Sequence, residues 1–318
     1  MSEPFTVRPF READLPEVLE VLRLSLGEPP GLTRTPDLFA WKHFGNPFGR
    51  SLMLVAEASG QIAGFRAFMR WDLAQPGGMM LRCVRAVDTA THPDFQRRGI
   101  FRLLTLAGVE VAINQGIDLI FNTPNEKSGA GYLTMGWSEI GAIGVMVRPG
   151  FGAIRPKRHN AAWNLSPRQA IDDVLSEDAL TEFGTRSSAG LRTPRTPAYL
   201  RWRFSSHPTA NYLFAQQGAS AAIGRAHIRN GRRELVVSEV VGSRGHDAVA
   251  ILRKESRPDY TVAWFSPGAP ERRIMVRSGL LPVPRYSALR LVARPLRELE
   301  SDLSWARWDL SLGDLELL

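Results

Sequence analysis

One short pattern occurs twice in this chain, and it constrains the fold more than any other feature. The segments RTPDLFAWKHFGNP (34–47) and RTPAYLRWRFSSHP (195–208) align without a gap at an offset of 161 residues. The Arg, Thr, Pro and Trp residues and the final Pro coincide, and Lys42 aligns with Arg203. This repeat predicts two related domains, because its period is far too long for a solenoid.

The similarity extends on both sides of a gap in the alignment. Beyond the first pattern, GFRAFMR (64–70) resembles GRAHIR (224–229). The later parts realign at an offset of 143 residues, where two pairs coincide: Pro124 with Pro267, and Gly136 with Gly279. The second copy is therefore 18 residues shorter (161 − 143) in its middle.

The length of the chain agrees with this duplication. Its 318 residues suit two domains of about 150 residues. We expect a first domain over 1–150, a connector with one helix over 151–194, and a second domain over 195–318. The hydrophobic content of 44% is enough for packed cores, so the chain is not disordered by composition.

Several classes of protein are disfavoured by composition. The single cysteine, Cys83, excludes an intrachain disulfide, and its apolar surroundings predict a buried thiol. The six histidines show no metal-ligand spacing, so no metal is expected. No apolar run approaches the roughly 20 residues that span a bilayer, and the first residues lack the features of a signal peptide. We therefore expect a soluble cytoplasmic protein.

The net charge of +8 indicates an anionic partner, either a phosphorylated cofactor or a nucleic acid. Only 4 of the 40 basic residues are lysines, and an arginine bias of this kind is also typical of a GC-rich genome. The arginines are spread along the chain, with no dense basic run and no interleaved aromatic residues. Nucleic acid is therefore the less expected partner.

The first domain alternates strand and helix patterns. Helical spacing predicts helices over 11–27, 102–116 and 126–136. Alternating or apolar runs predict strands over 5–10, 81–91, 117–124 and 141–149, and a hairpin over 51–73 that turns at Ser59-Gly60. In the second domain, RNGRRE (229–234) predicts another hairpin turn. The order is typical of an α/β fold on a mixed sheet.

The stretch THPDFQRRGIF (91–101) joins a predicted strand to a predicted helix. Amides in the first turn of a helix have no intrahelical partners, and with the helix dipole they form an anion site. Arg97 and Arg98 add positive charge, and Gly99 allows close approach to the backbone. The alternative is a basic helix start with Phe101 in the core.

Two motifs in this region resemble the GNAT N-acetyltransferase superfamily. The first is Gln96-Arg97-Arg98-Gly99-Ile100-Phe101, against the family's Gln/Arg-x-x-Gly-x-Gly/Ala, from which Phe101 departs. The second comprises four residues at the family's spacing: Asn125, Tyr132, Gly136 and Trp137. The resemblance covers about 1–150. It implies an α/β protein of two tandem GNAT-like domains, each a mixed, mostly antiparallel sheet flanked by helices, with a degenerate second copy.

The resemblance also implies an acetyl-CoA site. Its pyrophosphate would face the loop and helix start, and its pantetheine arm would pair with the preceding strand. The residues implied are Thr89, Ala90, Thr91, Gln96, Arg97, Arg98, Gly99, Ile100, Phe101 and Asn125. Asn125 is also implied as a catalytic residue, because it lies where the family parts two strands to admit the acyl arm. Two alternatives stay open: the threonines belong to an ordinary strand, and Asn125 is a turn or cap residue.

The catalytic role implied for Tyr132 is that of the general acid that protonates the departing thiolate. The alternative is a core tyrosine on a short helix. No residue stands out as the base; Asp88 on the preceding strand is the first candidate and Glu110 the second, although members of the family often use water. The resemblance also points to the C-terminal segment, which offers Asp314, Glu316 and the terminal carboxylate, since tandem members can fold this end back to the first site.

The second copy lacks the groups that such chemistry needs. At the offset of 143, Asn125 aligns with Gly268 and Tyr132 with Met275, and no Gln-x-x-Gly is present. A methionine cannot donate a proton, so the second domain is predicted to be catalytically silent and to shape the acceptor pocket or mediate a homodimer.

The function implied is an acetyl-CoA-dependent N-acetyltransferase. A small amine acceptor (an amino sugar, antibiotic or metabolite) would attack directly in a ternary complex. Two alternatives remain: a tRNA-dependent aminoacyl transferase of tandem-GNAT type, and a non-catalytic CoA-binding or scaffold protein.

Overall fold

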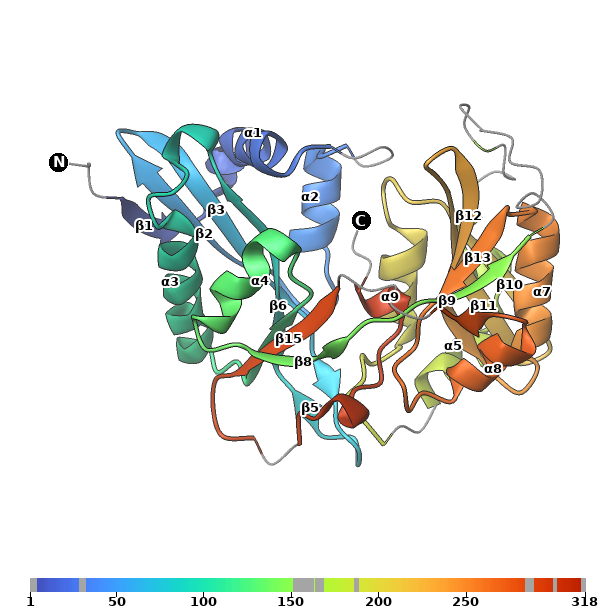
Figure 1. The fold of residues 1–318 in the computed structure, drawn as a ribbon. Coiled ribbons are helices and arrows are strands. Elements are labelled where there is room, and N and C mark those ends of the chain that lie inside the picture. Colours follow the sequence, from blue (N-terminus) through green and yellow to red (C-terminus); the bar gives the residue numbers. More distant parts are fainter. Residues whose placement is uncertain are drawn as a thin grey trace. The chain divides into compact units, whose positions relative to one another are not determined.

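Each copy of the repeat begins with a short helix that the repeated sequence itself caps. These helices are α2 (Pro36–His43) and α6 (Pro197–Leu200) (Figure 1). The structure is a computed structural model that describes residues 5–28, 33–150, 163, 169–185, 189–283, 289–299 and 302–315. The hydroxyls of Thr35 and Thr196 accept hydrogen bonds from backbone amides three residues on, and a proline follows each threonine. The repeated Arg-Thr-Pro is therefore a helix start used twice.

The first compact unit contains Met1–Leu73, Met80–Gly141 and Leu289–Asp302. It is built on a seven-stranded sheet in the order β1-β2-β3-β6-β7-β15-β8. The pairs β1–β2, β2–β3, β3–β6 and β7–β15 are antiparallel, whereas β6 and β7 are parallel and joined through α3. The strands are β1 (Thr6–Pro9), β2 (Leu52–Ala58), β3 (Gln61–Arg70), β6 (Cys83–Thr91), β7 (Leu119–Asn122), β15 (Arg290–Pro295) and β8 (Ser138–Ala142).

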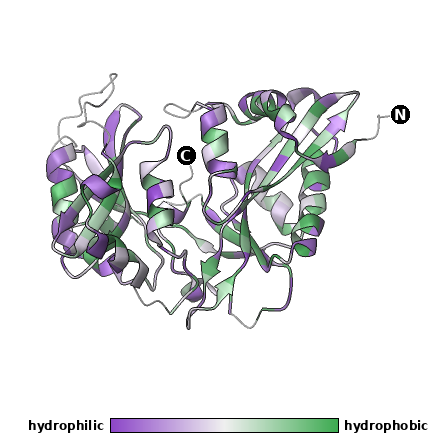
Figure 2. Ribbon diagram, turned by 180° about the vertical axis from the view of Figure 1, so that it is seen from behind, coloured by the Kyte–Doolittle hydropathy of each residue, from purple (hydrophilic) through white to green (hydrophobic). Residues whose placement is uncertain are grey.

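Helices cover both faces of this sheet. Apolar residues of α1 (Leu15–Leu26) and α2 pack on one face, against β2, β3 and β6. Those of α3 (Ile100–Asn114) and α4 (Glu126–Leu133) pack on the other. A Cβ on Gly108 of α3 would lie 2.2 Å from the Phe68 ring, so a glycine permits this close approach of helix and sheet. Figure 2 shows hydrophobic residues along the strands and helices that carry both kinds of residue.

The second compact unit contains Ala74–Met79, Ala142–Ala288 and Leu303–Leu318. Its six-stranded sheet has the order β10-β11-β12-β13-β9-β14, and β12 and β13 are parallel. The strands are β10 (Tyr212–Gln217), β11 (Ser220–Arg229), β12 (Arg232–Val241), β13 (Tyr260–Ala263), β9 (Met146–Pro149) and β14 (Leu281–Pro282). The α-helices are α5 (Glu177–Thr185), α6, α7 (Gly245–Ser256), α8 (Glu271–Arg277) and α9 (Leu312–Leu315).

The two units repeat one succession of elements. A hairpin, a third strand, a helix, a parallel strand and a short helix run through β2-β3-β6-α3-β7-α4 and again through β10-β11-β12-α7-β13-α8. The predicted fold class, α/β with two mixed sheets flanked by helices, is confirmed. Short elements complete the chain: β4 (Leu73–Ala74) paired with β5 (Met80–Leu81), and single helical turns at Glu12–Asp14, Pro93–Phe95, Ile171–Asp173, Arg201–Ser205 and Trp305–Arg307.

Each sheet takes one strand from the later part of the other copy. The strand β15, late in the second copy, pairs with β7 in the first sheet, whereas β9, at the end of the first copy, pairs with β13 in the second. The expected domain boundaries near 150 and 195 therefore do not coincide with the compact units. The single strand expected over 141–149 was wrong: the chain forms β8 and β9, which join different sheets.

Other expected elements were confirmed. The turn Ser59-Gly60 joins β2 to β3, and Asn230-Gly231 joins β11 to β12, all four with positive φ. Cys83 is fully buried, and burial raises the pKa of its thiol well above the usual range. The expected connector helix lies partly outside the described residues. Among the residues that are described, no helix is both long and apolar enough to cross a membrane.

Candidate acyl-transfer site

The strands β6 and β7 run side by side for only a short distance. Cys83–Arg85 pair with Leu119–Phe121, and the register of the two strands ends there. The remainder of β6 pairs with β3 along one edge, through Ala86, Val87, Ala90 and Thr91. On the other edge, no described strand pairs with 86–91. The parallel strands therefore part, and the predicted residues Thr89, Ala90 and Thr91 lie on the free stretch.

A β-bulge interrupts β6 within this stretch. The register against β3 shifts between Phe65 and Ala67, so that Arg66 lies opposite two residues, Asp88 and Thr89. Asp88 has a φ of 45°, a left-handed conformation in which aspartate is better tolerated than most residues. The bulge turns the side chains of Asp88 and Thr89 out of the regular alternation of the strand.

Asp88 is surrounded by basic side chains. Its carboxylate lies 2.7 Å from Lys42 Nζ, 3.0 Å from His43 Nε2 and 3.7 Å from Arg34 Nη1. Burial opposes ionisation, but Lys42 and His43 outweigh it and hold the pKa of Asp88 far below its usual range. The carboxyl is therefore ionised in the folded protein. Arg34 and Lys42, the two basic residues of the repeated pattern, both form ion pairs with this carboxylate.

His43 is fully buried, and burial lowers the pKa of its imidazole. Because the ionised Asp88 can only accept, Nε2 carries the proton that bonds it. Nδ1, 3.0 Å from Ser51 Oγ, then accepts from that hydroxyl. Both nitrogens of this neutral histidine are thus engaged.

Tyr132 is held in place by a hydrogen bond from a residue of β3. The hydroxyl of Tyr132, on α4, accepts a hydrogen bond from Arg66 Nη1 at 2.7 Å. The same nitrogen donates to Thr89 Oγ1 on the free stretch of β6. Tyr132 and Arg66 are buried, at 3% and 0% exposure. The chain Thr89–Arg66–Tyr132 therefore ties the predicted general acid to the strand predicted to bind the pantetheine arm.

The predicted phosphate loop has the backbone expected of an anion site. Arg97 and Gly99 adopt positive φ values of 64° and 80°, and α3 begins immediately afterwards, at Ile100. No side chain of a described residue caps α3, and its first turn contains no acidic residue. The first-turn amides and the positive end of a 15-residue helix are thus left for an anion, which fits a phosphate.

The departure at Phe101 is accommodated inside the domain. Its ring packs edge-on against Tyr132, with the ring centroids 5.4 Å apart. A Cβ on Gly131 would lie 2.8 Å from the Phe101 ring, so the glycine leaves room for it. Phe101 packs on α4 and leaves its backbone amide in the first turn of α3.

Asn125 is the N-cap of α4: its side-chain oxygen accepts from the Ser128 amide at 3.0 Å. This is the capping role that sequence left open. The sequence did not point to Asn122, which is 2% exposed and lies one position beyond the last β6–β7 pair. Its Oδ1 has no hydrogen-bond partner among the described residues. Arg66 was likewise missed, since nothing marks a strand arginine as functional.

The second unit lacks a comparable helix start. The first turn of α7 contains Asp247, which forms an ion pair with Arg244, and the Arg244 amide donates to Ser220 Oγ at 2.9 Å. Met275, aligned with Tyr132, is fully buried in the core of this unit. An acidic side chain at the helix start opposes the binding of a phosphate.

The C-terminal segment packs against β12 and against the residues that follow β13. Phe265 and Ser311 form a β-bridge, and α9 packs on β12. Asp314 is fully buried and bonds Arg195, which also bonds Glu239 of β12. Asp314, a candidate for the first site, therefore lies in the second unit; Glu316 lies outside the described residues.

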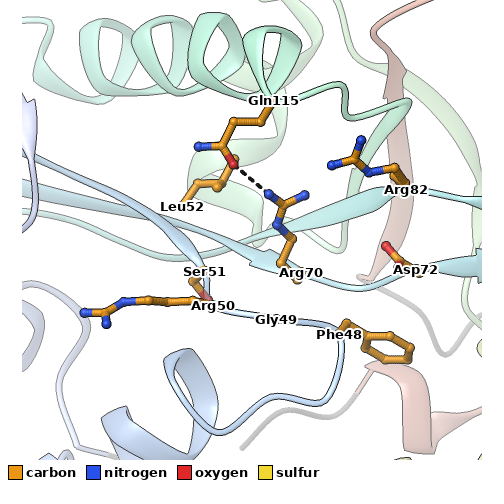
Figure 3. Close-up of a pocket in the computed structure, with 9 residues that line it drawn as sticks. All are labelled: Phe48, Gly49, Arg50, Ser51, Leu52, Arg70, Asp72, Arg82 and Gln115. Carbon is orange, nitrogen blue, oxygen red and sulfur yellow. Dashed lines mark hydrogen bonds between the residues drawn. The ribbon is translucent and has the colours of Figure 1, made fainter.

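A polar pocket of about 480 Å³ lies elsewhere in the first unit. Figure 3 shows Arg70 and Gln115 pointing toward one another, with 2.6 Å between Nη2 and Oε1. The lining residues are Phe48, Gly49, Arg50, Ser51, Leu52, Arg70, Asp72, Arg82 and Gln115. None of the predicted site residues belongs to this set. Within the described part of the chain, no cluster of three His, Cys, Asp or Glu residues could hold a metal ion.

Comparisons with known proteins bear on this site. Residues 6–140 match the family model described as an acetyltransferase (GNAT) domain. This match covers 135 of the 318 residues, and over that range the chain is similar to a GNAT acetyltransferase domain. A comparison with curated protein sequences finds no significant match.

Solved structures share the fold over most of the chain. A GCN5-related N-acetyltransferase from Anabaena variabilis is 13% identical, with a TM-score of 0.65 over 92% of this chain and 73% of that one. Eis1 from Mycobacterium abscessus is 15% identical, with a TM-score of 0.56 over 92% of this chain and 74% of that one. At such identities the likeness concerns the fold.

Proposed function

We propose that the chain is an acetyl-CoA-dependent N-acetyltransferase that acts on a small amine by direct attack in a ternary complex. The observation that carries this proposal is the link Thr89–Arg66–Tyr132, which holds a buried phenol beside the free edge of β6. A proton donor next to an unpaired strand edge fits a thioester whose amide arm extends that sheet. The name N-acetyltransferase, shared by several proteins of this fold, agrees with an amine acceptor.

In this proposal the first-turn amides of α3 and the loop before it bind the pyrophosphate of acetyl-CoA. The open backbone of Thr89, Ala90 and Thr91 pairs with the pantetheine amides. The loop residues involved are Gln96, Arg97, Arg98, Gly99, Ile100 and Phe101, of which Phe101 contributes its amide only. Asn125 caps α4 through its oxygen, which leaves its side-chain NH₂ group to the acyl arm.

The chemistry transfers an acyl group between two nucleophiles. The nitrogen lone pair of the amine attacks the thioester carbonyl, a C–N bond forms, and the C–S bond breaks. Tyr132 gives its proton to the departing sulfur, and the extra proton of the amine leaves to water. Each proton then has a donor and an acceptor without a metal or redox step.

The predicted role of Asp88 as base finds no support in its surroundings. A carboxylate whose pKa is held far below the usual range is a weak proton acceptor. We propose that Asp88 stays ionised and anchors Lys42 and His43 under the bulge, thereby fixing the free stretch of β6. Residues 195–318 are proposed to be a degenerate domain without a CoA site.

A binding experiment and a turnover experiment test this function together. Addition of acetyl-CoA to the full chain should raise the melting temperature, and thiol should be released with at least one of four acceptors: glucosamine, an aminoglycoside, spermidine or a lysine peptide. Stabilisation by aminoacyl-tRNA without any effect of acetyl-CoA would favour the tRNA-dependent alternative. Stabilisation by acetyl-CoA without thiol release would favour a CoA-binding protein.

A further inference from the structure

Arg66 is a buried cation that no acidic group of the described residues neutralises. It is completely buried, and no described carboxylate lies within ion-pair distance of its guanidinium. Its Nε and Nη2 have no hydrogen-bond partner among the described residues. A buried charge of this kind destabilises a fold unless something offsets it. A residue that a core would be more stable without is a candidate for a functional role.

The neighbours of Arg66 offset this cost only in part. The guanidinium carbon lies 4.4 Å from the ring centre of Phe68 and 5.3 Å from that of Tyr132, which allows cation–π attraction. These rings bear no charge. The position therefore suits a negative charge that exists only during part of a reaction.

The hydrogen bond from Arg66 fixes the direction of the phenol proton. A guanidinium has donors and no acceptor, so the Tyr132 oxygen must accept from Nη1. The proton of Tyr132 then points elsewhere, and none of the described residues accepts it. Phe101 and Trp137 hold the ring edge-on, with centroids 5.4 and 5.1 Å from that of Tyr132. The phenol is thus oriented with a proton to give.

We propose that Arg66 is the positioning residue for the general acid, an inference that rests on the proposed acetyl transfer. Arg66 directs the Tyr132 proton toward the leaving sulfur and stabilises the phenolate left behind. In this step the O–H bond of Tyr132 breaks, and the electron pair released from the C–S bond takes up the proton to form the S–H bond of coenzyme A. The negative charge rests on the tyrosine oxygen, in a charge-assisted hydrogen bond with Arg66, until solvent restores the proton.

Four variants of the full chain test this role: Arg66→Met, Arg66→Lys, Tyr132→Phe, and the double variant that combines Arg66→Met with Tyr132→Phe. The assay is thiol release from acetyl-CoA, with hydroxylamine as a surrogate acceptor beside the four amines named above. Arg66→Met should lower kcat at least about tenfold and leave KM for acetyl-CoA within about threefold, as expected for a transition-state interaction. Arg66→Lys should recover part of the loss, because it keeps the charge.

The double variant decides whether Arg66 acts through the phenol. In the Tyr132→Phe background, Arg66→Met should slow turnover by less than about threefold, because residues that act as a unit are not additive. Losses that multiply would overturn the inference. Arg70→Met, on the same strand and outside the proposed site, is the matched control and should leave kcat unchanged.

A thermal melt separates positioning from a structural role. Since Arg66→Met removes an unneutralised buried charge, its melting temperature should stay within about 3 °C of the wild type or rise. A large fall in melting temperature together with the loss of turnover would mean that Arg66 only supports the fold. A slow Tyr132→Phe with an unimpaired Arg66→Met would refute the role of Arg66 alone, whereas an unimpaired Tyr132→Phe would refute the proposed acid.

Discussion

Replacement of Asp88 by asparagine tests whether the bulge on β6 is held electrostatically. Asparagine keeps the size of the side chain and tolerates the left-handed backbone at φ 45°, so the change removes the charge and little else. Lys42, with a side-chain exposure of 8%, then loses a carboxylate 2.7 Å away. Breaking a buried pair from one side destabilises by about 3–5 kcal/mol.

In thermal unfolding, this loss should lower the transition of the first unit by roughly 6–20 °C, at about 2–4 °C per kcal/mol for a domain of this size. Calorimetry at neutral pH measures the shift. The matched control is Asp94→Asn, whose side chain is 82% exposed and whose effect should stay within about 0.5 kcal/mol. A second substitution, Lys42→Met, should restore much of the stability that Asp88→Asn loses.

The same reasoning predicts how the stability of the folded protein depends on pH. The folded pKa of Asp88 is lower than its unfolded value of about 3.9, so the carboxylate stabilises the fold fully above that value. The contribution is lost as the pH falls below about 3.9 toward the folded pKa. The melting temperatures of wild type and Asp88→Asn should converge there. Equal stability of the two proteins at neutral pH would refute the account of the bulge.

Three further predictions follow from local geometry. Gly99→Val and Gly60→Val place a β-branched residue at φ values of 80° and 76° without steric contact. Both variants should therefore lose about 1–2 kcal/mol of stability. Only Gly99→Val should also weaken acetyl-CoA binding in calorimetric titration. Gly108→Ala should lower stability in urea by about 1–3 kcal/mol, because its Cβ would lie 2.2 Å from a phenylalanine ring, whereas Gly129→Ala, in open space on α4, should be neutral or stabilising. Cys83 should react with an aromatic disulfide reagent only after unfolding, since its buried thiol has a raised pKa.

Local sequence patterns predicted most of the secondary structure. The hairpin turns at Asn230-Gly231 and Ser59-Gly60 and the helix that follows Gly99 are encoded within a few residues and were predicted. The helices capped by Thr35 and Thr196 depend on equally local signals but were missed. Such signals depend on hydrogen bonds and φ preferences of neighbouring residues. They can therefore be predicted without the tertiary fold.

Strand partners could not be predicted in this way. The segment 141–149 has the composition of one strand, and nothing local shows that its two halves join different sheets. The choice depends on which sheet edges are open, and these edges are formed by residues distant in sequence. The strand order of both sheets was thus beyond local patterns.

The candidate site could likewise be predicted only in part from the sequence. The loop and Tyr132 were predicted from the resemblance to GNAT motifs, but the arginine that bonds Tyr132 comes from β3, 66 positions earlier. The bulge that brings Thr89 to the same nitrogen depends on the register of β3 and β6. Side chains that meet through sheet register and helix packing leave no fixed spacing in the sequence.

Turnover by Tyr132→Phe tests the central claim most directly, because the proposed transfer depends on the proton of that phenol. Thiol release from saturating acetyl-CoA should fall at least about tenfold, as expected when a general acid is removed, while the dissociation constant for acetyl-CoA stays within about threefold of wild type. Unchanged turnover with a proven amine acceptor would contradict the account.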